Sequence, residues 1–119
     1  MKLLIAGGRD YTATDDLIDA INSLIQSGDI IEKGLEIVSG MALGADTCAI
    51  EIAKLNNLPL RKFPANWALY GRSAGYRRNV DMAQYSDVLL AAWDGKSKGT
   101  KHMIDTMKKL DKPVFVLRY

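Results

Sequence analysis

Residues 2–10 read KLLIAGGRD, and this stretch decides how the rest of the chain is interpreted. Residues 2–6 form a short run that is apolar on both faces, which is typical of a strand buried in a parallel sheet. Gly7 and Gly8 end the run, and Arg9 and Asp10 follow directly. A buried strand that stops at glycines and charges predicts a polar loop at the carboxyl edge of such a sheet.

Similar apolar runs occur at residues 35–38, 59–63, 87–92 and 114–117. Between them, apolar residues recur at helical spacing. The predicted helices lie around residues 17–25, 45–55, 74–85 and 103–110.

Local signals refine these boundaries. Thr12 and Asp15 predict a capping box at the start of the first helix, and Gly28 predicts its end. Residues 65–75 are predicted to be irregular, the longest such stretch in the chain.

The alternation of strands and helices predicts the α/β class. We expect residues 1–119 to form a single Rossmann-like, three-layer domain with a mainly parallel five-stranded sheet and right-handed crossovers. The chain has 119 residues, of which 48% are hydrophobic and 25% charged, so it can fill one core. Intrinsic disorder is excluded by the same composition.

Composition also limits the possible partners. The net charge of +2 is too small to indicate binding to nucleic acid or membrane by charge alone. Cys48 and His102 are the only cysteine and histidine, which excludes an internal disulfide and a Cys/His metal cluster. No metal or cofactor is predicted. The N-terminal apolar run is too short for a signal peptide, so a cytoplasmic setting is expected.

Loops that follow the predicted strands differ from those that precede them. The loops after the strands, residues 7–10, 39–46 and 93–100, are rich in glycine and in charged or hydroxyl side chains. The loops before strands, residues 56–58 and 111–112, contain no glycine. Glycine lets a backbone approach a ligand closely, and helices starting after such loops favour anions. Three such loops on one sheet edge predict a site for a phosphate or nucleotide, although glycines at strand ends also serve as ordinary turns.

Two familiar phosphate motifs are absent. The pattern Gly-x-Gly-x-x-Gly does not occur, and a P-loop ending at Gly95-Lys96-Ser97 would need a glycine where the chain has Leu90. The sequence therefore supports neither a dinucleotide fingerprint nor a P-loop NTPase.

Four segments, taken in order, resemble the YspA/YpsA-like branch of the SLOG superfamily. They are residues 8–10, residues 39–46, residues 74–79 with Met82, and residues 93–100. The superfamily includes the LOG phosphoribohydrolases and the DNA-processing protein DprA. The resemblance implies a Rossmann-like fold and a nucleotide or nucleotide-derived ligand, such as an ADP-ribose-like or NAD-like molecule.

Two of these segments correspond to hydrolase motifs. Gly95, Gly99 and Thr100 resemble part of the Pro-Gly-Gly-x-Gly-Thr phosphate loop, and residues 78–82 resemble the Arg-Lys-x-x-Met stretch. The chain departs from the hydrolases in having Asn79 in place of their lysine and Met103 in place of their glutamate.

Together, the loops and the resemblance predict the ligand-binding residues, and Arg78 is expected to contact phosphate. The predicted set is Gly7, Gly8, Arg9, Asp10, Ser39, Gly40, Gly44, Asp46, Arg78, Asn79, Trp93, Asp94, Gly95, Ser97, Gly99 and Thr100. Several members also have a structural explanation: Asp46 as a helix N-cap, and Asp10 and Asp94 as turn residues. The catalytic residues are left open, with Asp10 and Asp94 as candidates.

Aromatic and basic side chains near these loops are open to two interpretations. Trp67 and Tyr70 either stack on a base or pack their own loop. Arg72 and Arg77 either bind an anion with Arg78 or form a solvated face.

Three functions are compatible with these residues. The first is a sensor or sequestering module for a nucleotide-derived small molecule, with a homo-oligomer as a further possibility. The second is a hydrolase that cleaves an N-glycosidic or phosphate bond. The third is a DprA-like single-stranded nucleic-acid binder, which the low net charge disfavours.

Overall fold

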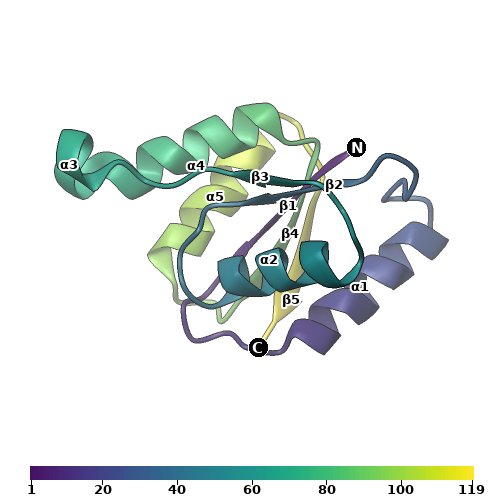
Figure 1. The fold of residues 1–119 in the computed structure, drawn as a ribbon. Helices are drawn as coiled ribbons and strands as arrows, with labels where there is room; N and C mark the ends of the chain where they lie inside the picture. Colours follow the sequence, from purple (N-terminus) through teal and green to yellow (C-terminus); the bar gives the residue numbers. More distant parts are fainter.

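The computed structural model describes residues 1–119 and contains one five-stranded sheet, whose strand order is β3-β2-β1-β4-β5 (Figure 1). All four strand pairs are parallel. The strands are β1 (Lys2–Gly7), β2 (Glu36–Ser39), β3 (Leu60–Lys62), β4 (Val88–Trp93) and β5 (Val114–Arg118). The predicted α/β class and parallel sheet are confirmed.

Helices cover both faces of this sheet (Figure 1). They are α1 (Thr14–Gln26), α2 (Ala45–Leu55), α3 (Trp67–Tyr70), the 3-10 turn η1 (Gly71–Ser73), α4 (Ala74–Tyr85) and α5 (Lys98–Lys109). Helices α1 and α2 lie on one face and α4 and α5 on the other, while α3 lies beyond the start of α4 at one end of the molecule. None of the helices has the length and apolar character that a membrane span requires.

Two apolar layers hold the sheet between the helices. Leu3 and Ile5 of β1 point into the layer shared with α1 and α2. Leu4 points into the opposite layer with α4 and α5. All three side chains are fully buried. The central strands are therefore apolar on both faces because neither face meets water.

The strand order creates a switch point between β1 and β4. From β1 the chain runs outward through β2 to β3, and then crosses to β4 and continues outward to β5. The loops that leave β1 and β4 therefore turn to opposite sides, which opens a crevice at their carboxyl ends.

Two local predictions were wrong. Thr12 and Asp15 form no capping box, because Ala13 occupies the N-cap of α1 and no side chain caps it. Residues 65–75 are not irregular, since α3 and η1 lie within them. The Asn66 side chain caps α3 by accepting from the amide of Leu69 at 3.1 Å. A helix of four residues is too short to leave a hydrophobic period in the sequence.

Gly44 joins the loop after β2 to the loop after β1. Its φ of +74° is one that side-chain-bearing residues rarely adopt, and a Cβ atom there would lie 2.1 Å from the carbonyl oxygen of Gly8. The amide of Ala45 donates to the same oxygen at 3.2 Å. The two loops thus pack backbone against backbone.

We expect Gly44→Ala to destabilise the protein by on the order of 3 kcal/mol, because strain and overlap with backbone add together. Gly34 is a matched control, since it also has positive φ, at +73°, but open space around it. Gly34→Ala should cost only about 1 kcal/mol. Urea unfolding of both variants measures the difference, and equal losses would contradict the packing argument.

Candidate functional site

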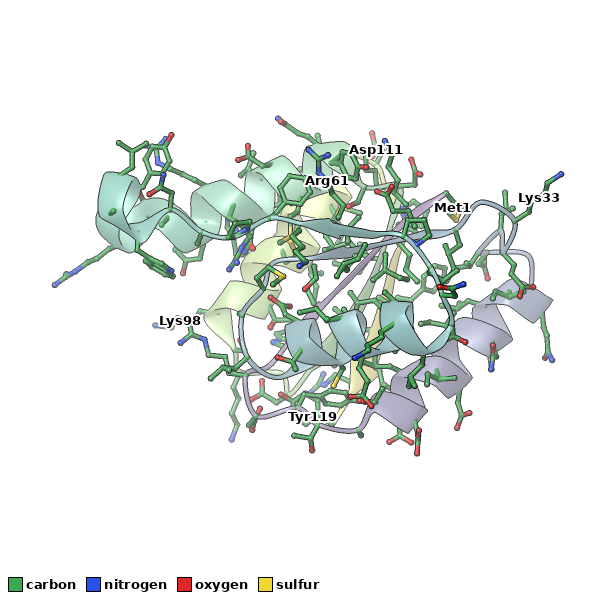
Figure 2. The ribbon with its side chains drawn as sticks, in the orientation of Figure 1. Met1, Lys33, Arg61, Lys98, Asp111 and Tyr119 are labelled. Carbon is green, nitrogen blue, oxygen red and sulfur yellow. The ribbon has the colours of Figure 1, made fainter.

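A cleft of about 480 Å³ opens at the carboxyl ends of β1 and β4, and we call it the main cleft. Figure 2 shows Lys98, at the start of α5, and Tyr119 toward this end of the molecule, whereas Met1 and Lys33 lie at the opposite end. The cleft is lined by Ala6, Gly7, Gly8, Arg9, Asp10, Ala42, Asp46, Arg78, Asn79, Met82, Asp94, Ser97, Gly99, Thr100 and Met103.

Most residues predicted from the loops therefore lie together. The main cleft also contains four residues that pattern reasoning did not assign to a site: Ala6, Ala42, Met82 and Met103. Small and apolar residues of this kind are indistinguishable from core in a sequence. Met82 and Met103 are buried core residues that also line the cleft. Met82 belongs to a segment that resembles the family, and Met103 stands where the hydrolases have a glutamate; these positions are the only signals in the sequence.

Five predicted residues do not line the main cleft: Ser39, Gly40, Gly44, Trp93 and Gly95. The fully buried Ser39 hydroxyl donates to the carbonyl of Asp46 at 3.0 Å and accepts from the amide of Met41 at 3.2 Å. Gly40 lines a neighbouring cavity instead. Ser39 and Gly44 thus shape the second loop from within.

Trp93 and Gly95 have a similar role in the last loop. The indole Nε1 of Trp93 donates to the carbonyl of Ser97 at 3.1 Å, and the Arg118 guanidinium lies 5.3 Å from the centre of its ring system. Gly95 has a φ of +84° and leaves room for that guanidinium. These contacts hold the loop in a fixed path toward α5.

Arg78 and Asn79 enter the cleft from α4. The Arg78 guanidinium is half-buried and donates through Nη1 to the carbonyl of Gly40 and through Nε to Asn79 Oδ1. Burial lowers the pKa of Arg78, while the nearby Asp46 charge partly offsets this. The Asn79 amide donates to the carbonyl of Gly99 at 3.3 Å and lies 3.2 Å from His102 Nδ1. Asn79 thus links α4 to the start of α5.

Asp46 is not the N-cap of α2, contrary to its structural interpretation, because Gly44 occupies that position. Asp46 lies inside the first turn, and its carboxylate accepts from the amide of Ala42 at 3.1 Å. Only 6% of the residue is exposed. Burial raises the pKa of this carboxyl, although the Ala42 amide and the charges of Arg78 and Arg9 oppose the shift.

The pKa of Asp94 is shifted in the direction opposite to that of Asp46. One of its oxygens, Oδ1, accepts from the amides of Lys96 and Ser97, both at 2.8 Å. These amides lower the pKa of the Asp94 carboxyl. Ser97 caps α5, and its hydroxyl oxygen accepts from the amide of Thr100 at 3.4 Å.

Tyr119, which follows β5, contacts the loop after β1. The Tyr119 hydroxyl donates to Asp10 Oδ1 at 2.6 Å, and the Tyr119 ring meets the Tyr11 ring edge-on at 4.8 Å. A Cβ at Gly8 would overlap this hydroxyl at 1.7 Å. Burial and the Asp10 charge raise the pKa of Tyr119 well above its ordinary value.

The fold and the position of the cleft define a Rossmann-like α/β protein. Residues 1–70 match the family described as YAcAr, the YspA, cpYpsA-related SLOG family. The chain belongs to this family. It is also 31% identical over 119 residues to the Gene 61 protein of Mycobacterium phage D29, covering 95% of this chain and 93% of that protein.

A solved structure has a similar fold at low sequence identity. It is that of DNA processing protein A from Helicobacter pylori, described for its single-stranded DNA binding mode. The TM-score is 0.65 and the identity 21%, and the match covers all of this chain and 66% of the other. At this identity the likeness concerns the fold alone.

We expect Asp46→Asn to stabilise the protein at pH 7 by up to about 1 kcal/mol, because it removes a desolvated charge. The folded state holds the Asp46 proton more tightly than the unfolded chain does. The stabilisation from this proton is therefore present at acid pH and lost as the pH rises through the folded-state pKa. Urea unfolding at several pH values should show a weaker decline with pH in the variant.

The carboxyl of Asp105 provides a control, because its pKa is shifted in the direction opposite to that of Asp46. The ammonium of Lys101 lowers the pKa of this exposed carboxyl. Its contribution to stability is present above the unfolded pKa and lost on acidification. A destabilised Asp46→Asn protein at pH 7 would contradict the assignment of Asp46 as a desolvated carboxylate.

Proposed function

We propose that the main cleft binds a nucleotide or nucleotide-derived ligand through its phosphate groups, as a sensor or sequestering module. The observation that carries this proposal is that two arginines line one concave site and neither forms a salt bridge. Arg9 and Arg78 both line the cleft, and the charge of Asp46 lies near them, yet the only ion pair in the protein joins Lys101 to Asp105. Arginines in a concave site that are not held in a salt bridge suit an anionic ligand.

The backbone supports the same assignment. Gly99 and Thr100 of the first turn of α5 line the cleft beside these arginines. Amides at a helix start attract phosphate through both hydrogen bonding and the helix dipole. We place the phosphate groups between Arg78 and this helix start.

The carboxylates of the cleft fit the sugar of such a ligand. The low pKa keeps Asp94 ionised at neutral pH, and its Oδ2 is left to accept from a ribose hydroxyl. Asp10 offers a second acceptor, held in place by Tyr119. A phosphate next to these carboxylates would be repelled, so the sugar is the better occupant of this side of the cleft.

Binding without turnover is favoured by the residue at position 103. The hydrolases that the last loop resembles carry a glutamate there, whereas Met103 is 1% exposed and lines the cleft. A thioether neither donates nor removes a proton in place of that carboxyl.

The test is isothermal titration calorimetry with ADP and ADP-ribose. Arg78→Ala should weaken binding of both by roughly 10- to 100-fold, which is the typical effect of losing a charged hydrogen bond. Arg77→Ala is the matched control, because the Arg77 guanidinium lies over the Tyr70 ring at 4.5 Å and does not line the cleft. Equal affinities in the two variants, or no binding by the unmodified protein, would refute the proposal.

A second candidate function is hydrolysis of an N-glycosidic bond of the same ligand. One observation favours it: Asp46 and Asp94 line one cleft and have pKa values shifted in opposite directions. Carboxyls separated in this way can divide the roles of proton donor and acceptor. Here Asp46 would protonate the leaving base and Asp94 would activate water.

Release of free base from ADP-ribose or AMP, followed by chromatography, measures this activity. We expect Asp46→Asn and Asp94→Asn each to lower any turnover by at least about 100-fold, in line with general acid–base catalysis. Absence of product in the unmodified protein would leave ligand binding as the function of the cleft.

A further inference from the structure

A cavity of about 270 Å³, distinct from the one that Gly40 lines, adjoins the main cleft, and we call it the side cavity. Arg9, Arg78, Asn79 and Gly99 line both spaces. The two arginines proposed to bind phosphate therefore stand at the junction between two hollows. A ligand anchored at this junction has room to extend in either direction.

Aromatic rings form part of the side cavity. Trp67 of α3 and Tyr76 of α4 both line it, and they are 54% and 47% exposed. The Tyr76 ring packs on the imidazole of His102, with centroids 4.5 Å apart. Exposed aromatic surface that borders a cavity offers a stacking platform for a planar ring.

The charges of the two spaces differ. Asp10, Asp46 and Asp94 line the main cleft, whereas no carboxylate lines the side cavity. Arg72 adds a cation there without an acidic partner. The main cleft therefore suits a sugar with its hydroxyls, and the side cavity suits a neutral, electron-rich heterocycle or a further phosphate.

We propose that the ligand of this protein is a dinucleotide, with two nucleosides joined through phosphate groups. This inference rests on the proposed function of the main cleft. The bridging phosphates lie at Arg9 and Arg78, one nucleoside occupies the main cleft, and the second base stacks on Trp67 and Tyr76 in the side cavity. The structure thereby assigns a base-binding subsite to α3 and the start of α4.

A small ligand fits these spaces better than a nucleic-acid strand. Across both spaces the lining cations are Arg9, Arg72 and Arg78, and they face three carboxylates of the main cleft. A strand needs a continuous basic groove that follows its backbone. Charges balanced in this way favour a ligand with few phosphates.

The experiment compares ADP with diadenosine diphosphate, which share one adenosine diphosphate unit and differ by the second adenosine. We expect Trp67→Ala and Tyr76→Ala to weaken binding of diadenosine diphosphate on the order of 10-fold, the usual effect of removing a stacking ring. Binding of ADP should change by less than about 2-fold. Trp67→Phe keeps a ring and should recover most of the affinity.

Leu69→Ala is the matched control, because Leu69 lies on the same short helix, is 66% exposed and lines neither space. It should leave both affinities unchanged. Equal weakening of ADP and diadenosine diphosphate by Trp67→Ala would show a single base site and overturn the inference. So would unchanged binding of diadenosine diphosphate in both alanine variants.

Two further outcomes separate this inference from the proposed function. If the unmodified protein binds ADP but binds diadenosine diphosphate no more tightly, the second subsite is refuted and the proposed function stands. If it binds neither, both are refuted. A ten-residue oligothymidylate that binds more tightly than diadenosine diphosphate would overturn the inference in favour of a nucleic-acid strand.

Discussion

Parallel pairing on both sides of β1 is the constraint on which the rest of the molecule depends. Parallel neighbours require crossover connections, and these place helices on both faces of the sheet. All loops that follow strands then meet at one edge. Because β1 lies in the middle of the order β3-β2-β1-β4-β5, its loop and the loop after β4 turn apart and leave the main cleft between them.

The glycines at this edge are explained mainly by packing. Gly44 and Gly8 leave no room for a side chain because the Gly8–Arg9 backbone and the Tyr119 hydroxyl fill the space. Many amides of these loops are also occupied within the protein, such as that of Gly8, which donates to the carbonyl of Ala92 at 3.1 Å. The glycines thus bring the loops together, whereas the proposed function assigns anion binding to the arginines and the start of α5. The packing role of the glycines follows from coordinates and is not readable from a glycine pattern.

Strands, long helices and the position of the cleft could be predicted from the sequence because each has a repeated or directional signal. Apolar runs predict β1 and β4, and apolar residues at helical spacing predict α4 and α5. Polar loops indicate the carboxyl edge of the sheet. The orientation of Asp46 could not be predicted, since an acidic residue near a helix start has the same appearance whether it caps the helix or turns back to Ala42. The side cavity could not be predicted from the sequence either, because Trp67 and Tyr76 line one cavity only as a result of how α3 packs against α4.

The scarcity of ion pairs has a consequence for the response to ionic strength. The one pair, Lys101 with Asp105, is exposed and lies within a single helix, so its screening changes the folding equilibrium little. The fold rests on apolar layers that dissolved ions barely weaken. Added salt should therefore leave the folded state intact while it screens the attraction between an anionic ligand and the arginines of the proposed site. A salt titration would then weaken binding of the ligand without unfolding the protein.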